Sequence, residues 1–288
     1  MALRREPLDR DLTGTDLTGT DLTGTDLTGA DLTKHDPAQP VVEFRDTSYT
    51  VSDNQVLDKL NLQVHAGEIL VLLGRSGSGK TTALKMVNAL LSPTSGQVLV
   101  QGRPTTAWDP IRLRRGIGYV IQEVGLFPHF TVERNVGLVP SLERWPPERI
   151  HSRTEDLLRQ VSLDPAQYLN RYPRQLSGGQ RQRVGVARAL AADPALLLFD
   201  EPFGALDPVT RLELQDQFLE LRRAFGKTSL FVTHDVREAL RLGTRIGLLR
   251  RGKLEVLATP AEFLQSTHPE ALAFLACLAE PRLDPAQN

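Results

Sequence analysis

Hydrophobic residues along this chain fall into short runs separated by stretches of helical spacing, beginning at Val41. Val41–Phe44 and Val56–Val64 alternate or run apolar, and Glu68–Leu73 is an almost continuous apolar run. A continuous run of this length is typical of a strand buried on both faces of a parallel sheet. Further runs of the same kind are Gly116–Ile121, Leu196–Phe199, Ser229–Val232 and Ile246–Leu249.

Helical spacing fills the intervals between these runs. Lys80–Leu91, Pro208–Ala224 and Val236–Leu242 each follow a predicted strand. Such alternation predicts an α/β fold with a mostly parallel sheet. Residues 123–190 carry apolar residues at helical spacing and few strand signals, so we expect an inserted α-helical subdomain there. The core domain then spans 41–259, and 260–288 is expected to be a short helical tail.

A five-residue period marks the beginning of the chain. Asp11 to Thr33 reads DLTGT, DLTGT, DLTGT, DLTGA, DLT, which resembles the pentapeptide repeats that wind into a four-sided β-helix. One coil of that family uses four repeats, so this segment would make little more than one turn without stacked neighbours. Aspartate and glycine also disfavour strands. We therefore expect residues 1–40 to form a solvated tail, with an ordered coil as the alternative.

Composition narrows the classes of function. The chain has 288 residues, 40% of them hydrophobic, and a formal net charge of −1, which gives no electrostatic argument for a nucleic-acid partner. Its single cysteine, Cys277, excludes an intramolecular disulfide and is expected to be an apolar filler. No apolar run approaches the length that spans a bilayer, and the first residues lack the apolar stretch of a secretory signal. Work at a membrane would require another subunit.

A glycine-rich loop follows the predicted strand Glu68–Leu73. Its glycines permit a tight turn in which backbone N–H groups face phosphate oxygens, and the following helix adds the positive end of its dipole. Lys80 would reach the β- and γ-phosphates, and the Thr81 hydroxyl can bind Mg²⁺. The candidate ATP ligands here are Gly74, Arg75, Ser76, Gly77, Ser78, Gly79, Lys80, Thr81 and Thr82.

Two carboxylates follow the predicted strand Leu196–Phe199. Ligands of α/β sheets bind at the ends of such strands, so Asp200 is placed to hold Mg²⁺. Glu201 would orient or deprotonate an attacking water. The alternative is that the pair caps the N-terminus of a helix. The phosphate loop upstream favours the catalytic interpretation.

A second phosphate-facing helix start is predicted at Leu176–Gln180. Ser177 is a natural N-cap, and two glycines in a first turn would weaken an ordinary helix without reason. They would let an anion approach the helix terminus. A second phosphate site is redundant within one chain, so we expect it to serve the nucleotide of a partner. The candidate residues are Ser177, Gly178, Gly179 and Gln180.

Three further polar residues stand near predicted strand ends. Gln122 follows a strand and is a candidate for catalysis and for contact with Mg²⁺, and its loop 123–130 is expected to face outward. His234 is placed to hydrogen-bond a γ-phosphate, although a lone histidine in this position is more often structural. Asp207 is by default a turn residue and a candidate nucleotide contact.

Taken in order, these motifs resemble those of the ATP-binding cassette ATPases. The set comprises Gly74–Thr81, Gln122, Leu176–Gln180, Asp200–Glu201, Ala205–Asp207 and His234. The resemblance implies a P-loop α/β core in which an antiparallel β subdomain accompanies the mostly parallel sheet. It also implies a head-to-tail homodimer with ATP between the phosphate loop of one subunit and Ser177–Gln180 of the other. It also implies that Glu201 is the catalytic base and that His234 senses the γ-phosphate. The adenine-stacking aromatic of the family lies near Val51, where this chain offers Tyr49.

A finer resemblance covers IGYVIQEVGLFPHFTVERNVGLVP and RYPRQLSGGQRQRVGVARALAADP. These segments are similar to ATPase subunits of bacterial importers for glycine betaine, choline and carnitine. That family implies transmembrane permease subunits, an extracytoplasmic substrate-binding protein that the ATPase need not touch, and a place at the cytoplasmic face of the inner membrane. Many of its members carry C-terminal CBS domains, for which we expect no room here.

Other functions remain open at this point. An importer ATPase for another small solute, such as an amino acid, would share every motif. A soluble cassette protein of DNA repair or translation is the rival from another class, but those proteins split or duplicate the cassette, and this one is contiguous. A binding scaffold built on residues 11–33 would need a longer repeat.

Overall fold

The computed structural model describes residues 39–122, 124–204 and 206–278. The five-residue repeat, and with it the expected tail at 1–40 up to residue 38, lies outside the described residues. Within them, no helix combines the length and the apolar character that crossing a bilayer requires.

A six-stranded sheet forms the centre of the fold, in the order β10–β9–β3–β8–β7–β6. Neighbouring strands run parallel except for the antiparallel pair β9–β10. The predicted mostly parallel sheet is confirmed. Its strands are β3 (Ile69–Leu73), β6 (Ile117–Val120), β7 (Leu196–Asp200), β8 (Thr228–Thr233), β9 (Arg245–Arg250) and β10 (Lys253–Ala258).

A separate four-stranded antiparallel sheet has the order β2–β1–β4–β5. Its strands are β1 (Val42–Val51), β2 (Asn54–Val64), β4 (Ser95–Val100) and β5 (Arg103–Pro104). The sequence pattern predicted only the first third of β1. The strand continues through the polar residues after Phe44 because pairing with β2 and β4 satisfies its backbone.

Helix α1 (Lys80–Val87) is shorter than predicted, so the expectation of a helix to Leu91 was wrong. Asn88 caps it, and Ala89 has a φ of 52°, which a continuing right-handed helix cannot contain. The other helices beside the sheets are α2 (Pro110–Arg115), α8 (Pro208–Phe225) and α9 (Val236–Leu242), with a short 3₁₀ turn at Thr105–Ala107.

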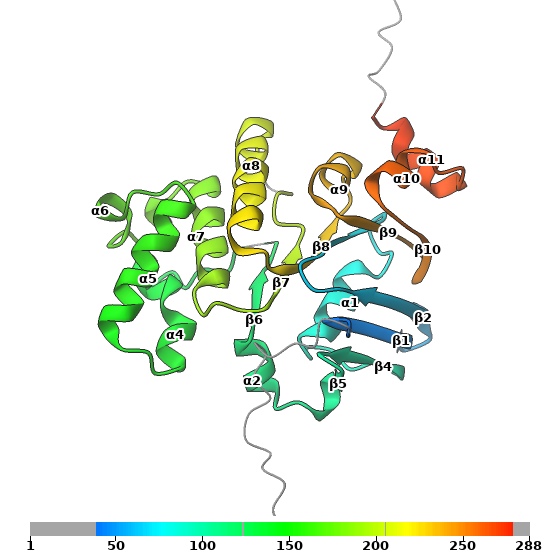
Figure 1. The fold of residues 1–288 in the computed structure, drawn as a ribbon, viewed down its shortest axis with the longest axis horizontal. Helices are drawn as coiled ribbons and strands as arrows, with labels where there is room; N and C mark the ends of the chain where they lie inside the picture. Colours follow the sequence, from blue (N-terminus) through cyan, green and yellow to red (C-terminus); the bar gives the residue numbers. More distant parts are fainter. Residues whose placement is uncertain (1–38, 123, 205, 279–288) are drawn as a thin grey trace, which may run out of the picture. The chain divides into compact units, whose positions relative to one another are not determined.

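The stretch assigned to a helical subdomain contains five helices. Figure 1 shows α4 to α7 grouped beside β6, away from strands β1, β2 and β4. These helices are α3 (Val132–Val136), α4 (Leu138–Leu142), α5 (Pro147–Gln160), α6 (Pro165–Tyr168) and α7 (Gly178–Leu190), with a 3₁₀ turn at Pro173–Gln175.

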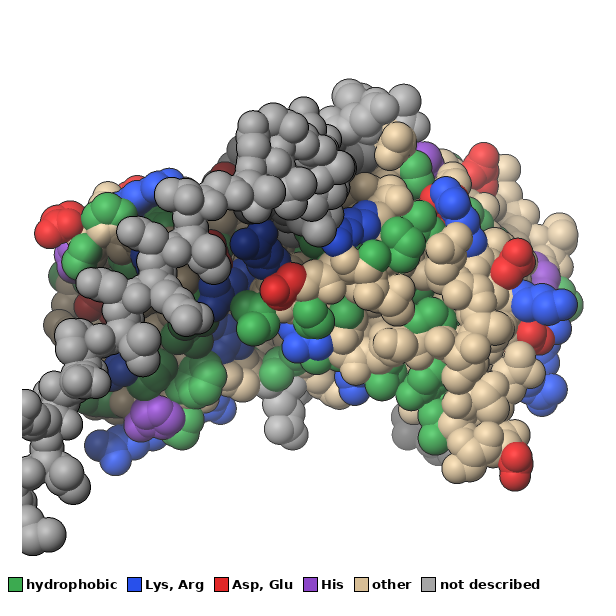
Figure 2. All heavy atoms as spheres, turned by 90° about the horizontal axis from the view of Figure 1, so that it is seen from below, with side chains coloured by type: hydrophobic (Ala, Val, Ile, Leu, Met, Phe, Trp, Pro, Cys, Tyr) green, Lys and Arg blue, Asp and Glu red, His purple; other side chains and the backbone are tan. Residues whose placement is uncertain are grey.

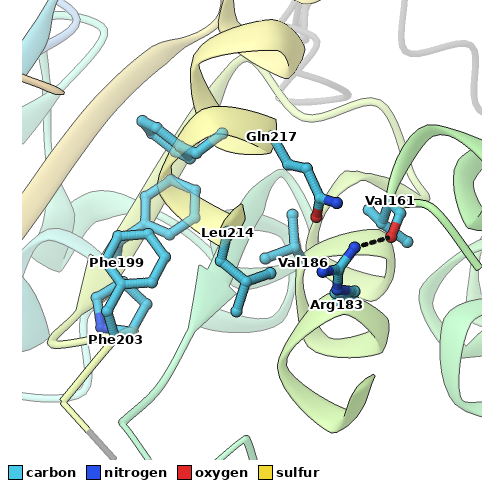
Figure 3. A pocket seen from close by; sticks show the side chains of 9 residues that line it. Val161, Arg183, Val186, Phe199, Phe203, Leu214 and Gln217 are labelled. Carbon is cyan, nitrogen blue, oxygen red and sulfur yellow. Dashed lines mark hydrogen bonds between the residues drawn. The ribbon is translucent and has the colours of Figure 1, made fainter. Parts of the chain in front are cut away.

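Aromatic side chains pack where α7 and α8 cover the sheet. Phe199 of β7 meets Phe218 edge to face and stacks on Phe231, with ring centroids 4.9 and 5.6 Å apart. The pocket in Figure 3 lies here, lined also by Phe203 and Leu214. Its volume of about 10 Å³ holds no more than about one water. It is therefore a packing defect and not a nucleotide site.

Two short helices follow β10: α10 (Pro260–Leu264) and α11 (Pro269–Ala276). Phe263 and Ala271 are fully buried, so both helices belong to the core. Cys277, expected as an apolar filler, is exposed because it lies just past the end of α11. In Figure 2, charged side chains of both signs are interspersed over one face.

Candidate active site

The phosphate loop connects β3 to α1, as the sequence predicts. Gly77 and Gly79 have φ values of 76° and 102°, where side chains are strained. Gly74 has no room for a side chain, since a Cβ there would lie 2.4 Å from the Leu249 carbonyl oxygen and 2.6 Å from Ser78 Oγ. Glycine is thus required at 74 by packing and at 77 and 79 by backbone conformation.

Lys80 is the buried cation of this loop. Its side chain is inside the fold, and Nζ donates to the Gly74 and Arg75 carbonyl oxygens at 2.8 and 3.0 Å. Burial lowers the pKa of the ammonium group, while the charges of Glu201 and Asp200 act to raise it. The loop therefore holds a positive charge among carbonyl dipoles and beside two carboxylates, where a phosphate oxygen can replace the carbonyl acceptors.

Thr81 and Asp200 meet beneath the loop. The Thr81 hydroxyl donates to Asp200 Oδ1 at 2.8 Å, and the Tyr119 hydroxyl donates to Oδ2 at 3.4 Å. Burial raises the pKa of Asp200, against the hydrogen bond from Thr81, which lowers it. A hydroxyl and a carboxylate at this spacing form the oxygen donor set that Mg²⁺ prefers. These residues fit the predicted metal role.

Glu201 and His234 form the second pair of the site. His234 Nδ1 lies 2.9 Å from Glu201 Oε2, and the imidazole is exposed. Glu201 has a φ of 46°, and its N–H donates to the Val232 carbonyl at 3.0 Å. A glutamate in the left-handed region is uncommon. The strained backbone, anchored on β8, fixes the direction in which the carboxylate points.

Gln122 reaches the same place from β6. A Cβ built on Gly204 would lie 3.9 Å from Gln122 Nε2 and 4.0 Å from Glu201 Oε2. The structure thus brings Gln122 and Glu201 together next to Gly204, and His234 joins them through its contact with Glu201. Ala205, of the predicted Ala205–Asp207 motif, lies outside the described residues.

The segment Ser177–Gln180 starts α7 with a reciprocal cap. Gln180 N donates to Ser177 Oγ at 3.2 Å, Ser177 N donates to Gln180 Oε1 at 2.9 Å, and Gln180 Nε2 donates to the Tyr168 hydroxyl at 3.0 Å. Ser177 and Gly178 are exposed, and a Cβ on Gly178 would meet no atom within 4 Å. In the described part of the chain, the side-chain hydrogen bonds of Ser177 and Gln180 therefore stay within this helical region and do not reach the phosphate loop.

Asp207 and Tyr49 have local partners. Asp207 accepts from Thr210 N at 3.0 Å, and this capping bond lowers the pKa of the Asp207 carboxyl. Tyr49 is half-buried and pairs across β1–β2 with Leu57, whose side chain packs 2.6 Å from the Cβ position of Gly79. With regular alternation, Tyr49 and Val51 would lie on the same face of β1, because they are two residues apart. Bulges on both sides of Tyr49 break that alternation. Adenine stacking on Tyr49 stays a prediction.

Sequence reasoning missed two side chains that bear on the site. Tyr119 could have been suspected, since a tyrosine in a buried strand needs a partner for its hydroxyl. Its pKa is raised by burial and then by Asp200. The other is Glu270, whose Oε1 lies 2.7 Å from Nε of Arg75 in the phosphate loop. No local sequence signal indicates the contact between Arg75 and Glu270, because these residues are 195 positions apart.

Comparison with protein families decides the assignment. The model described as "ABC transporter" matches residues 57–204. The chain belongs to the ABC transporter family. The model described as "Pentapeptide repeats (8 copies)" matches residues 11–36, which confirms the resemblance of the N-terminal segment.

Relatives agree with this membership. The osmoprotectant import ATP-binding protein OsmV of Salmonella typhimurium is 51% identical over 73% of this chain and 55% of its own length. The glycine betaine/carnitine/choline transport ATP-binding protein OpuCA of Bacillus subtilis is 49% identical over 74% of this chain and 56% of its own. The chain thus spans about half the length of these relatives.

Solved structures confirm the predicted fold class. The dimeric structure of MJ0796, a bacterial ABC transporter cassette, aligns with a TM-score of 0.69 and 34% identity, covering 76% of this chain and 98% of that one. A second structure of MJ0796, a dimer in a post-hydrolysis state bound to ADP and Pi, aligns with a TM-score of 0.68 over the same fractions.

Proposed function

We propose that this chain is the ATP-hydrolysing subunit of a membrane importer for quaternary-amine osmoprotectants such as glycine betaine, choline or carnitine. The observation that carries the ATPase part is the convergence of Lys80, Thr81, Asp200, Glu201 and His234 at one edge of the sheet. The cargo class rests on the relatives named for these solutes.

In this proposal, the loop N–H groups and Lys80 bind the ATP phosphates, and the aromatic ring of Tyr49 stacks on adenine. Mg²⁺, when bound by Thr81, Gln122 and Asp200, supplies charge stabilisation to the β- and γ-phosphates. Glu201 orients the attacking water and accepts its proton. Thr82 and the remaining loop residues complete the phosphate contacts.

His234 has a role that its hydrogen bond constrains. A ring that donates from Nδ1 to Glu201 presents Nε2 as an acceptor while the imidazole is neutral. Donation from Nε2 to a γ-phosphate then requires either the imidazolium form or release of Glu201. A neutral His234 ring that carries its proton on one nitrogen can therefore donate to Glu201 or to the γ-phosphate but not to both, which suits the proposed sensing of the γ-phosphate.

The proposed active form is a head-to-tail homodimer. Ser177 Oγ already accepts from Gln180 N, but its hydroxyl proton is left to donate to an anion. Exposure of Ser177 and the open space at Gly178 leave this helix start accessible to a second subunit. The dimeric MJ0796 cassette supports this arrangement. Asp207, three residues after Gly204, is placed to face the partner across the same interface.

Coupling to a permease is proposed at the loop after Gln122. A cleft of about 380 Å³ is lined by Gln122, Leu126 and Gln182, and the Gln182 amide nitrogen is buried there without a hydrogen-bond partner among described residues. Beside it, the half-exposed ring of Phe127 packs on His129 and Phe130. Movement of Gln122 on hydrolysis would thus reach an apolar surface suited to a membrane subunit.

The protein would act at the cytoplasmic face of the inner membrane, with an extracytoplasmic binding protein that reads the cargo. Import of a different solute is the second candidate. Sulfate/thiosulfate import ATP-binding proteins CysA are 40–42% identical over 77–83% of this chain, and the motifs of the site do not distinguish cargo.

The direct test is Mg²⁺-dependent ATP hydrolysis by the purified full chain. Wild type should release phosphate, and Lys80→Ala should lose both ATP binding and turnover because the buried cation of the loop is gone. Equal turnover by the two proteins would refute the proposed site.

A further inference from the structure

The C-terminal helix α11 touches the phosphate loop through a single buried carboxylate. Glu270 Oε1 accepts from Arg75 Nε at 2.7 Å, and Oε2 lies 3.5 Å from Arg250 Nε. The Glu270 side chain is only 9% exposed, whereas that of Arg75 is 69% exposed. Glutamate is seldom buried to this degree unless it is paired. The contact is therefore a built feature of the fold.

Helix α11 holds this carboxylate firmly. Pro269 begins the helix and Ala271 is fully buried in the core, so the first turn cannot shift freely. Glu270 N donates to His268 Nδ1 at 3.3 Å. An acidic residue in a first turn is also favoured by the helix dipole. The helix thus aims Glu270 at the loop from a fixed position.

Charges around the contact are mostly positive. A hollow of about 280 Å³ separates α11 from the loop and is lined by Arg75, Arg250, Arg251 and Glu270. Ser78 Oγ, in the loop wall of this hollow, is buried without a hydrogen-bond partner among described residues. Among the described residues that line this hollow, Glu270 is the one carboxylate, and it stands beside three arginines.

Both the side chain and the backbone carbonyl of Arg75 have hydrogen-bond partners. Its guanidinium pairs with Glu270, and its carbonyl accepts from Lys80 Nζ at 3.0 Å. A triphosphate entering the loop is strongly anionic, so it gains from Arg75 and Lys80 and is repelled by Glu270. As long as Glu270 binds Arg75, the Arg75 guanidinium is not free to bind a phosphate, and the Glu270 carboxylate lies close to the loop.

We infer that Glu270 is a positioning residue by which the C-terminal helix weakens ATP binding at the phosphate loop. It acts through Arg75, which it keeps from the phosphates. The inference rests on the proposed phosphate-binding role of the loop.

A double-mutant cycle tests this. ATP binding is measured with Mg²⁺ present in the full chain carrying Glu201→Gln, so that turnover does not deplete ATP. Glu270→Gln should lower the Kd for ATP roughly threefold to tenfold, the size expected for an anion removed near a phosphate site. In the Arg75→Gln background the same change should alter Kd less than about twofold, since coupled residues do not act additively.

Two measurements distinguish an effect of the Glu270 charge on ATP binding from a general loosening of the structure. The gain from Glu270→Gln should fall between about 50 mM and 500 mM salt, because an exposed guanidinium is screened. Glu255→Gln is the matched control: Glu255 on β10 pairs with His268 at 3.5 Å and does not touch the loop. It should leave Kd within about twofold at either salt concentration.

The possible outcomes distinguish failure of the inferred role of Glu270 from failure of the proposed phosphate loop. Unchanged or weaker ATP binding in Glu270→Gln, with wild type binding ATP and Lys80→Ala not, overturns the role of Glu270 alone. A gain that persists undiminished in Arg75→Gln or at high salt also overturns it. Failure of wild type to bind ATP, or normal binding by Lys80→Ala, instead overturns the proposed phosphate loop.

Discussion

Thr81 and Asp200 stand 119 positions apart in the sequence, yet the Thr81 hydroxyl donates a 2.8 Å hydrogen bond to the Asp200 carboxylate. The sheet order explains the meeting, because β3 and β7 both flank β8 and run parallel to it. Groups at the carboxyl ends of parallel strands share one edge. The phosphate loop, the carboxylates of Asp200 and Glu201, and His234 therefore all lie at this edge of the sheet.

Glu201→Gln tests the proposed base. The amide keeps the shape of the side chain but cannot accept a proton, so turnover should fall roughly 100-fold to 10,000-fold. ATP binding should persist because the loop and Lys80 are unchanged. Without hydrolysis, ATP should hold the chain as a dimer in gel filtration. Turnover at the wild-type rate would exclude Glu201 as the base.

Asp200→Asn should raise the stability of the folded protein and abolish its Mg²⁺-dependent ATP hydrolysis. The pKa of Asp200 is raised by burial, so the native state binds this proton more tightly than the unfolded chain does. The contribution to stability is present below the unfolded pKa of about 3.9 and is lost as pH rises through the higher native pKa. Ionised Asp200 therefore costs stability at neutral pH, and Asn removes that cost.

The expected result is a higher melting temperature for the nucleotide-free Asp200→Asn protein at pH 7–8, together with loss of Mg²⁺-dependent hydrolysis. The gain should shrink as pH is lowered through the native pKa and vanish below the unfolded pKa of about 3.9, where the wild-type carboxyl becomes neutral in both states. Thermal melts across this range provide the measurement. A lower melting temperature at pH 8 would show that the ionised carboxylate stabilises the site.

Much of this site could be predicted because its signals are local. The apolar run before Gly74 and the glycines after it specify a strand and a turn within one segment, and the run before Asp200 does the same. The end of α1 at Val87 could not be predicted, since Ala89 adopts a positive φ only in its tertiary setting. The contact of Glu270 with Arg75 depends on where α11 docks, which no local pattern encodes.

Gly178→Ala tests whether the start of α7 serves a partner. On its own chain the new methyl group meets nothing within 4 Å, and alanine is the better helix former. Melting temperature should therefore stay equal or rise. ATPase activity should fall roughly tenfold or more, since losing 1.36 kcal/mol of transition-state contact costs that factor. The pair of measurements separates folding from function.

Gly179→Ala is the matched control, because its Cβ would lie 2.6 Å from Thr210 Cγ2 of α8. That variant should lose melting temperature, as overpacking predicts. If Gly178→Ala were fully active, a phosphate or partner contact at this glycine would be excluded.

A cross-link tests the head-to-tail arrangement. Cys277 is the only cysteine and is exposed, so it is first replaced by serine. Ser76→Cys and Ser177→Cys are then placed on exposed positions of the two motifs. A disulfide requires Cα atoms within about 7 Å. Oxidation should yield a linked dimer with ATP present in the Glu201→Gln background. Linkage within single chains would refute the arrangement.

The cargo is tested in cells, because an importer's ATPase subunit is not expected to contact the transported solute. Quaternary ammonium cations are recognised by aromatic cages through cation–π attraction, and such a cage would belong to the binding protein. Deleting the gene should therefore abolish uptake of radiolabelled glycine betaine or choline at high external osmolarity. Wild-type protein should restore uptake and Glu201→Gln should not, while the affinity of the binding protein for its ligand stays the same. Normal betaine and choline uptake in the deletion strain, with loss of sulfate uptake instead, would reject the cargo class. It would leave the ATPase assignment intact, because that depends on Lys80, Asp200 and Glu201.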